Sequence, residues 1–454
     1  MNRRAFFKKV GGTAALAGLS GFFTKKSWTM PNEIPLVGLG DCILTRRISA
    51  RRDKAFLDLV DVVRSADCAW GNCEVIFLEA DKGYPAPMGL AMHTICEPWV
   101  ADEFKWMGID FVGTANNHSK DYGNESVFST IKHLERVGIG YAGTGRNLQE
   151  ASRPRYIDTP GGRVGQVCCD ASAPEWWAAA YSSTFTKGRP GLNPLRIDRK
   201  VELDTQLFSN LLEVRSKLWE LSVGQPYKHK KGAVLDFYGT KFSEGDKVSM
   251  STAARKEDLD RITNALAIAR RNSRLVIQSI HSHEGYKNFE VPAQFMQPFA
   301  HSCIDAGADV FFNTGAHLLR GIEIYKGKPI FYSLGNFFFQ YETVKQIAAE
   351  TYEAAGLDRT THDPMTFYDV YAKIFRTKTY WESFVPFITY NDNSVTEIKL
   401  YPVELGFEEA RYRRGTPVMA GIKAGEAIIE RLARLSKPFG TAIEYRDGLG
   451  IVRL

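Results

Sequence analysis

Polar side chains that can hold metal ions or transfer protons stand where apolar runs of the sequence end. The runs cover residues 34–40, 70–78, 109–115, 274–280 and 309–312. Each run is short and apolar, as expected for a buried β-strand. The polar residues within or just beyond these runs are Asp41, Asn72, Glu74, Asn116, Asn117, His118, His281, His283, Glu284 and His317.

Carboxylates, amides and imidazoles together form the ligand set of hydrolases that use two divalent cations. Two such ions about 3.5–4 Å apart activate a water molecule and stabilise a developing oxyanion. The ligand set suits Mn, Fe or Zn about equally, so the sequence does not choose among them. A single histidine could equally be a structural residue held by hydrogen bonds. Polar residues at five strand ends together predict a site for one or two ions.

Strand and helix patterns alternate along the chain and would position these residues. Helical periodicity covers 53–66, 124–137 and 256–271, and the apolar strand runs lie between these helices. Such alternation predicts an α/β fold. Because the carboxyl ends of parallel strands meet at one edge of a sheet, the polar residues are expected to converge there.

Three segments differ from this alternating body, which is predicted to span residues 31–343. Residues 1–30 read as a targeting segment. Residues from about 171 to 255 are irregular and contain adjacent tryptophans and a basic stretch, so they predict an insertion or lid within the body. Residues 344–454 predict a C-terminal extension packed on the core.

The first residues resemble a bacterial twin-arginine export signal. Arg3 and Arg4 precede a weakly apolar run from Val10 to Phe23, which is followed by two lysines. Fourteen residues at 1.5 Å each reach only about 21 Å, short of the ~30 Å hydrocarbon core. The resemblance implies transport by the twin-arginine machinery to the periplasm or cell envelope. Membrane contact is expected only through this segment, if it is not cleaved.

The charge of the remaining chain argues against a nucleic-acid partner. The formal charge of +6 arises from 58 Lys and Arg against 52 Asp and Glu. Six of the basic residues and no acid lie in residues 1–30, so the rest of the chain is neutral (52 against 52). A neutral body lacks the basic footprint of a protein that binds nucleic acid.

Several motifs together resemble the CapA (poly-γ-glutamate capsule synthesis) family. The resemblance runs from about Pro35 to Thr343. Its segments are GDCILTRRIS (40–49), GNCEV (71–75), TANNHSKDYG (114–123), YAGTGRNLQEA (141–151), SIHSHEG (279–285) and GIEIYKGKPIFYSLGNFFFQ (321–340). The resemblance implies the fold of calcineurin-like metallophosphoesterases, a four-layer αββα sandwich with its metal site along one edge.

The resemblance also implies a role for each matching residue. His118 matches the general acid that protonates a leaving group, and Glu74 stands where relatives place a metal-bridging carboxylate. The implied metal ligands are Asp41, Glu74, Asn117, His281 and His317.

The sequence departs from the metallophosphoesterase pattern at two positions. Ile43 stands where a second ligand of the first motif is usual, and Thr314 replaces the first histidine of the last motif. Thr is a poor ligand for most divalent ions. Residues two apart on an extended chain share a face, so His283 could pair with His281 and supply the missing nitrogen.

The turn-rich segment GRPGLNPLR (188–196) offers residues for an anionic substrate. Arg189, Asn193 and Arg196 could bind carboxylate or phosphate groups, for which arginine is well suited. Contacts that brace the loop are an equal alternative for these side chains.

Three functions follow from these patterns. The first is an exported hydrolase that uses one or two divalent ions to cleave a phosphoester or γ-glutamyl amide bond in an anionic small molecule or polymer. The second is a capsule-assembly protein that binds the polymer without turnover, which Thr314 favours. A third, a plain phosphate- or peptide-binding module, predicts no bound metal.

Overall fold

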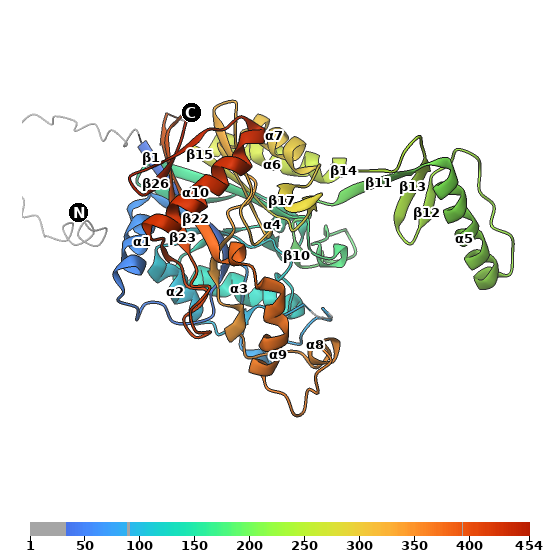
Figure 1. Cartoon of the computed structure of the whole chain (residues 1–454), viewed down its shortest axis with the longest axis horizontal. Helices are drawn as coiled ribbons and strands as arrows, with labels where there is room; N and C mark the ends of the chain where they lie inside the picture. Colours follow the sequence, from blue (N-terminus) through green and yellow to red (C-terminus); the bar gives the residue numbers. More distant parts are fainter. Residues whose placement is uncertain (1–32, 89–90, 393) are drawn as a thin grey trace, which may run out of the picture.

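The chain folds as a mixed α/β protein with a compact body and a projecting arm (Figure 1). The computed structural model describes residues 33–88, 91–392 and 394–454. The predicted export signal lies outside the described residues. The α/β fold predicted from the alternating pattern is confirmed.

A ten-stranded sheet contains the first predicted strand, β1, near its middle. Strands β1, β2, β5 and β6 run parallel, whereas β22 runs antiparallel to β1. Two further strands, β21 (Asn336–Phe339) and β24 (Val418–Met419), pair with β1 and β23. In spatial order the other strands are β25 (Ile443–Arg446), β26 (Leu449–Val452), β23 (Ser394–Glu404), β22 (Glu382–Asn391), β1 (Glu33–Ile43), β2 (Cys68–Asn72), β5 (Phe111–Gly113) and β6 (Gly140–Ala142).

A six-stranded sheet carries the later histidines. Its four central strands run parallel and its two edge strands antiparallel. The strands are, in spatial order, β19 (Ile322–Tyr325), β20 (Lys328–Phe331), β18 (Val310–Thr314), β15 (Leu275–His281), β9 (Gly162–Asp170) and β8 (Arg155–Thr159).

The two sheets pack against each other through one hydrophobic cluster. Trp70 of β2 stacks on Phe312 of β18 with ring centroids 4.9 Å apart. The other face of the first sheet is covered by α1 (Lys54–Ser65), α2 (Val100–Met107) and α3 (Gly123–Val137). The other face of the second sheet is covered by α6 (Lys256–Asn272) and α7 (Met296–Asp305). Helices α1, α2, α3, α6 and α7 therefore lie outside two facing sheets.

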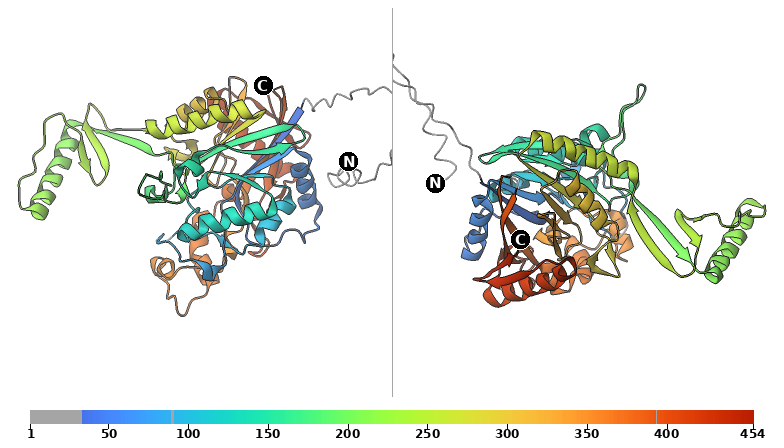
Figure 2. Two further views of the ribbon diagram at one scale, coloured as in Figure 1. Left: turned by 180° about the vertical axis from the view of Figure 1, so that it is seen from behind. Right: turned by 90° about the horizontal axis from the view of Figure 1, so that it is seen from above.

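An arm projects from the body within the segment predicted as an insertion (Figures 1 and 2). It has its own four-stranded sheet, and one long helix packs on that sheet. Its elements are β11 (Ile197–Leu203), α5 (Thr205–Val223), β12 (Leu235–Phe237), β13 (Thr240–Glu244) and β14 (Ser249–Ala254).

The C-terminal segment contributes strands to the first sheet. Strand β22 pairs with β1, and α10 (Ile422–Ser436) packs in the cluster between the sheets. A shorter stretch with α8 (Ala349–Ala354), α9 (Pro364–Tyr371) and the 3-10 turn η5 (Ala372–Phe375) lies on the body. Among the helices of the described residues, none combines the length and apolar character needed to cross a lipid bilayer.

Strand register brings the polar strand ends together. Asp41 is level with Asn72, and His281 is level with both Asp170 and Thr314. One predicted strand differs: the run 70–78 divides into β2 and β3 (Ile76–Phe77). Residues 73–75 lie between β2 and β3, so Glu74 stands in this connection, just after the Asn72 side chain that donates to Asp41.

Candidate metal centre

Glu74 lies at the centre of the converged residues. It is fully buried, and neither of its carboxylate oxygens has a hydrogen-bond partner among the described residues. Its Oε1 lies 3.6 Å from Nε2 of His281 and 3.8 Å from Nε2 of His317. A buried carboxylate is costly unless a cation or donors compensate it. The surrounding nitrogens and oxygens are of the type that binds a divalent ion.

Two groups of metal-ligating atoms share Glu74. The first consists of Glu74, His281 and His283, and the second of Asp41, Glu74 and His317. Within each group the ligand atoms lie within 4.8 Å of one another. The two groups offer ligand atoms for one or two divalent ions, and the donor set fits Mn, Fe or Zn.

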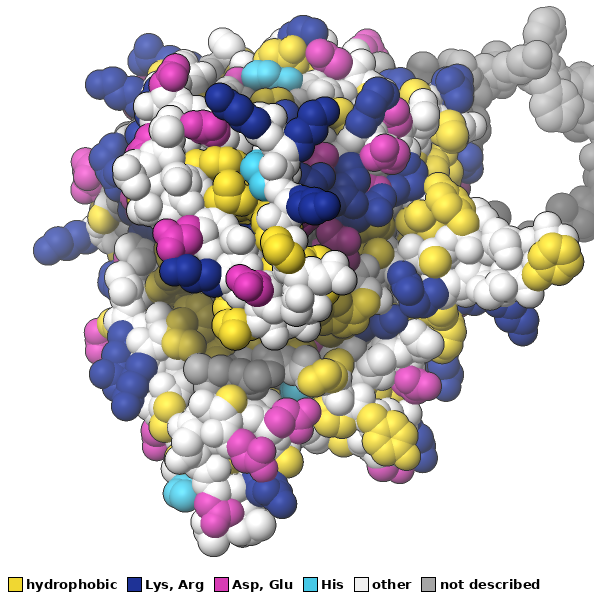
Figure 3. Space-filling model, turned by 90° about the vertical axis from the view of Figure 1, so that its right-hand side faces the viewer, with side chains coloured by type: hydrophobic (Ala, Val, Ile, Leu, Met, Phe, Trp, Pro, Cys, Tyr) yellow, Lys and Arg dark blue, Asp and Glu magenta, His cyan; other side chains and the backbone are white. Residues whose placement is uncertain are grey.

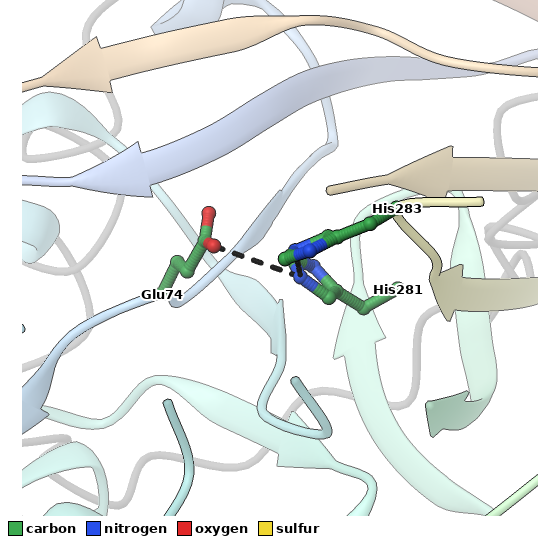
Figure 4. A group of neighbouring side chains, drawn as sticks. All are labelled: Glu74, His281 and His283. Atoms are coloured by element: carbon green, nitrogen blue, oxygen red, sulfur yellow. Dashed lines mark hydrogen bonds and ion pairs between the residues drawn. The ribbon is translucent and has the colours of Figure 1, made fainter. Parts of the chain in front are cut away.

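His283 lies beside His281, as their two-residue spacing suggested. Their Nε2 atoms are 3.0 Å apart and both rings face Glu74 (Figure 4). The backbone N–H of His283 donates to Ser172, which holds the loop after β15 inward. Two imidazole nitrogens at one side of a carboxylate can ligate the same cation.

Asp41 accepts a hydrogen bond at each of its two carboxylate oxygens. The Asn72 amide donates to Oδ1 at 2.7 Å, and the N–H of Gly315 donates to Oδ2 at 2.9 Å. Burial raises the pKa of Asp41, but the hydrogen bond and charge of His317, together with His281 and Asn72, outweigh it and hold the pKa well below the usual range. Asp41 is therefore ionised at neutral pH.

Burial sets the protonation of the other ligands. It lowers the pKa of His281 to about 3 and that of His283 well below its ordinary value. Both imidazoles are thus neutral at neutral pH and have a lone pair for a metal. Burial, with the charges of Asp41, Asp121 and Asp170, raises the pKa of Glu74 well above its ordinary value. A bound cation would reverse this shift.

His118 lies beside the ligands and has its own acidic partner. Its Nδ1 is 2.9 Å from Oδ2 of Asp121, and its Nε2 is 4.0 Å from Oε1 of Glu74. Asp121 also accepts a hydrogen bond from the N–H of Thr94, which fixes the carboxylate. Asp121 was not among the predicted site residues. Its position three residues after His118 in the same turn was the available signal.

The two adjacent asparagines have different environments. Asn116 donates to Oδ1 of Asn72 and to the carbonyl of Cys73, so it braces the chain next to Glu74. The Asn117 side chain, predicted as a ligand, is half-buried, and its Oδ1 has no hydrogen-bond partner among the described residues. That oxygen is free to bind a cation.

The turn after β18 sets the last part of the site. Oγ1 of Thr314 is 3.2 Å from Nδ1 of His281, so the threonine contacts a ligand histidine. Gly315 has a φ of +96°, and a Cβ there would lie 2.9 Å from the His281 ring. The next histidine, His317, has a φ of +57° and its Nδ1 is 2.9 Å from Oδ1 of Asn336. Only glycine at 315 permits this close approach.

The residues predicted to bind substrate contact the protein's own groups. Asn193 is buried and donates to the carbonyl of Cys168. Arg196 makes two hydrogen bonds to the buried carboxylate of Asp258. Arg189 is exposed and donates to the carbonyl of Ala178. All three brace loops, and substrate binding by them stays a prediction.

Aromatic residues from β21 and from the C-terminal segment cover the centre. The ring of Phe375 lies edge-on to His317, with centroids 6.0 Å apart, and Phe339 lies 5.5 Å from the same imidazole. Burial raises the pKa of Tyr371 to about 12, with a contribution from the charges of Glu74 and Asp121. Sequence patterns gave no signal for this cover because the segment is more than 200 residues from Glu74, His118 and Asp121.

Asp170 is a further buried acid at this edge. It ends β9 level with His281, and its Oδ1 has no hydrogen-bond partner among the described residues. Its Oδ2 accepts from the N–H groups of Ser172 and Ala173. Burial raises its pKa to about 7 despite these hydrogen bonds.

The sequence is similar to proteins of bacterial capsule synthesis. The family profile described as "Bacterial capsule synthesis protein PGA_cap" matches residues 35–341. The "PGA biosynthesis protein CapA" of Bacillus subtilis is 38% identical over 288 residues, which are 63% of this chain and 57% of that protein. The "Capsule biosynthesis protein CapA" of Bacillus anthracis is 23% identical over 68% of this chain and 60% of that protein.

A relative of nearly full length has no assigned role. "Uncharacterized protein y4sH" of Sinorhizobium fredii is 34% identical over 433 residues, which cover 92% of this chain and 93% of that protein.

Together, fold and site define an α/β protein with a buried group of carboxylates and histidines, of the types that ligate metal ions, at one edge of its sheets. The chain belongs to the PGA_cap family of bacterial capsule synthesis proteins, as the resemblance to CapA predicted.

We predict that Asp170 makes the metal-free protein less stable as pH rises. The native carboxyl keeps its proton up to a pKa of about 7, whereas the unfolded one loses it near its ordinary pKa of 3.8. The native state therefore binds more protons between pH 4 and 7, and the free energy of unfolding falls across this window. The fall is at most about 4 kcal/mol, at ~1.4 kcal/mol per pKa unit.

Urea unfolding in EDTA between pH 4.5 and 7.5 measures this slope. Asp170→Asn should flatten the slope, while Asp158→Asn, at an exposed ion pair, should leave it unchanged. Equal slopes for the wild type and Asp170→Asn would contradict the prediction.

Proposed function

We propose that this protein is an exported, metal-dependent hydrolase that cleaves an anionic polymer at the cell envelope. The names of its relatives link them to capsule and poly-γ-glutamate synthesis. The observation that carries the proposal is the buried, unpartnered carboxylate of Glu74 shared by two ligand groups, with His118 alongside.

We assign the body to the four-layer αββα sandwich of calcineurin-like metallophosphoesterases. Two facing sheets with helices outside each of them support this assignment. The position of the ligand groups at the carboxyl ends of β1 and β15 supports it as well.

Each residue of the centre would have a defined role in hydrolysis. When bound, one or two divalent cations would supply an activated water and neutralise developing charge. Asp41, Glu74, His281, His283 and His317, with Asn117, would hold them. His118 would give the leaving group its proton from Nε2, because Asp121 engages Nδ1 and fixes the ring orientation.

A cavity at the root of the arm suits an anionic substrate. It has a volume of about 430 Å³ and extends from Asp170, beside the metal centre, to the arm strands. Lys200 of β11 and Lys241 of β13 both line it and are level in register. The described part of the chain gives neither lysine an ion-pair partner. Acidic residues also line the cavity, but Glu175, Asp198 and Glu284 pair with its arginines. The two adjacent lysines therefore favour binding of carboxylates or phosphates.

One observation favours the alternative of a non-catalytic assembly protein. Thr314 contacts His281 where relatives of the metallophosphoesterase type supply a metal-binding imidazole. Such a protein would bind the polymer at the same cavity and leave it intact. Turnover of a phosphoester or γ-glutamyl substrate distinguishes the hydrolase from this alternative, because an assembly protein could retain a metal ion without cleaving the polymer.

We predict that Glu74→Gln abolishes metal binding. Protein reloaded with Mn or Zn should hold one or two equivalents, and losing the shared carboxylate should remove them all. Elemental analysis measures the content, and the thermal shift on adding metal gives an independent reading. Glu79→Gln, at a nearby exposed carboxylate, is the matched control. Less than about a tenth of an equivalent in the reloaded wild type would exclude a metalloenzyme.

We predict that His118→Gln slows hydrolysis about 10²- to 10⁴-fold for substrates with a poor leaving group. The loss should be much smaller with nitrophenyl esters, because nitrophenolate leaves without protonation. Rates on phosphoester and γ-glutamyl substrates measure this contrast, with unchanged metal content as the check on folding. His301→Gln is the control, because this histidine pairs with Glu323 and is not one of the candidate site residues. Equal losses for both leaving groups would refute the general-acid role.

We predict that the double variant Lys200→Gln and Lys241→Gln raises KM for an anionic polymer about 3- to 10-fold, because exposed ionic contacts contribute up to ~1 kcal/mol each. The kcat and the rate on a small neutral ester should not change. Lys228→Gln with Lys230→Gln, elsewhere on the arm, should behave as wild type. An unchanged KM would show that the cavity does not bind the substrate. That result would not contradict the proposed role of the metal centre.

A further inference from the structure

Arg320 is a fully buried arginine that contacts the backbone of the candidate metal centre. It lies three residues after His317, in the segment that follows β18, and its side chain has no exposed surface. Its Nε donates to the carbonyl oxygen of Phe289 at 2.8 Å, and its Nη2 donates to the carbonyl oxygen of His283 at 3.2 Å. The guanidinium thus joins a candidate ligand to the hairpin that follows it.

The charge of Arg320 has no counter-charge. Among the described residues no carboxylate forms an ion pair with its guanidinium, and its Nη1 has no hydrogen-bond partner. By contrast, Figure 3 shows Lys and Arg side chains lying among Asp and Glu on the surface of the arm side. A buried charge without a counter-charge is unfavourable by itself. General stability is therefore a poor explanation for an arginine at this position.

His283 lies outside the regular strands and depends on other side chains for its position. Strand β15 ends at His281, and the hairpin of β16 (Gly285–Tyr286) and β17 (Asn288–Pro292) begins two residues after His283. The N–H of His283 donates to Oγ of Ser172 at 2.7 Å, and its carbonyl accepts from Arg320. These two bonds hold the peptide groups before and after the His283 Cα. They therefore set the direction of its imidazole.

The segment that carries Arg320 is firmly anchored. Leu319 forms a β-bridge with Leu334, and both side chains are buried. Gly321 lies so close to α10 that a Cβ there would be 2.3 Å from the carbonyl oxygen of Leu435. The guanidinium of Arg320 therefore extends from a fixed base to a loop outside the sheet. A ligand held from a fixed base keeps its geometry before the metal binds.

The same segment contributes to both ligand groups. The two groups share Glu74, and His317 belongs to one of them while His283 belongs to the other. Arg320, three residues after His317, thus connects the segment of one group to the backbone of the other. A positive charge near a cation site opposes metal binding by Coulomb repulsion. Any benefit that Arg320 gives to metal binding must come from its hydrogen bonds.

We propose that Arg320 is a positioning residue that holds His283 in place to ligate a divalent cation. The inference rests on the proposed metal-dependent function and adds a residue to it. Outer hydrogen bonds orient metal ligands, and their loss lowers metal affinity about 10- to 100-fold. Loss of Arg320 therefore weakens the ion that His283 ligates and spares an ion held with His317.

Zinc titration of the full-length chain, stripped with EDTA and in competition with a chromophoric chelator, tests the proposal. His283→Gln identifies the ion that depends on His283. Arg320→Met should weaken that same ion about 10- to 100-fold and change any second ion less than about threefold. If Arg320→Met does not fold, Arg320→Lys, which keeps a donor, should give a smaller loss at the same ion. Added guanidinium should restore the affinity of Arg320→Ala, whereas tetramethylammonium, which donates no hydrogen bond, should not.

Arg431→Met is the matched control. Arg431 of α10 anchors the same hairpin by an ion pair with Glu290, 3.5 Å long, and it belongs to neither ligand group. This variant should bind zinc as the wild type does. Unchanged affinity in Arg320→Met, equal loss of two ions, or zinc that is indifferent to His283→Gln would overturn the proposal.

Hydrogen exchange in EDTA tests the positioning role without metal. The N–H of His283 should exchange at least about tenfold faster in Arg320→Met than in the wild type or Arg431→Met. Equal protection in all three proteins would overturn the inference. A wild type that binds no zinc, but shows this difference in exchange, would refute the proposed metal-dependent function while Arg320 still positions His283.

Discussion

The burial of the Glu74 carboxylate is the constraint around which this site is built. A charge placed between two β-sheets with no hydrogen-bond donor is strongly unfavourable by itself. The surrounding residues supply ligand nitrogens and oxygens in place of donors, and burial keeps the imidazoles of His281 and His283 neutral. The metal-free protein thus has a site whose electrostatic balance divalent cations would complete.

The rest of the body supports this arrangement through the backbone near the site. Asp41 and Asn72 are level in adjacent strands, so one amide hydrogen bond fixes a ligand carboxylate. The turn at Gly315 lets the His281 and His283 rings approach the chain, which a Cβ would prevent. Phe375 from the C-terminal segment lies against His317 and keeps that side of the centre apolar. Residues from one end of the chain to the other therefore meet in one site.

The arm adds surface of a different kind. Its root carries Lys200 and Lys241 into a cavity that extends to Asp170, the buried acid level with His281.

The sequence by itself determined the α/β fold, most strands and helices and the positions of Asp41, His118 and His281 at strand ends, because apolar periodicity is a local property. The pairing of His281 with His283 followed from their spacing of two residues. Only the tertiary structure decided that Glu74 is shared by two ligand groups, that Asp121 orients His118, and that Arg196 is engaged by Asp258. These contacts depend on strand register and turn geometry across long sequence separations, which no local pattern encodes.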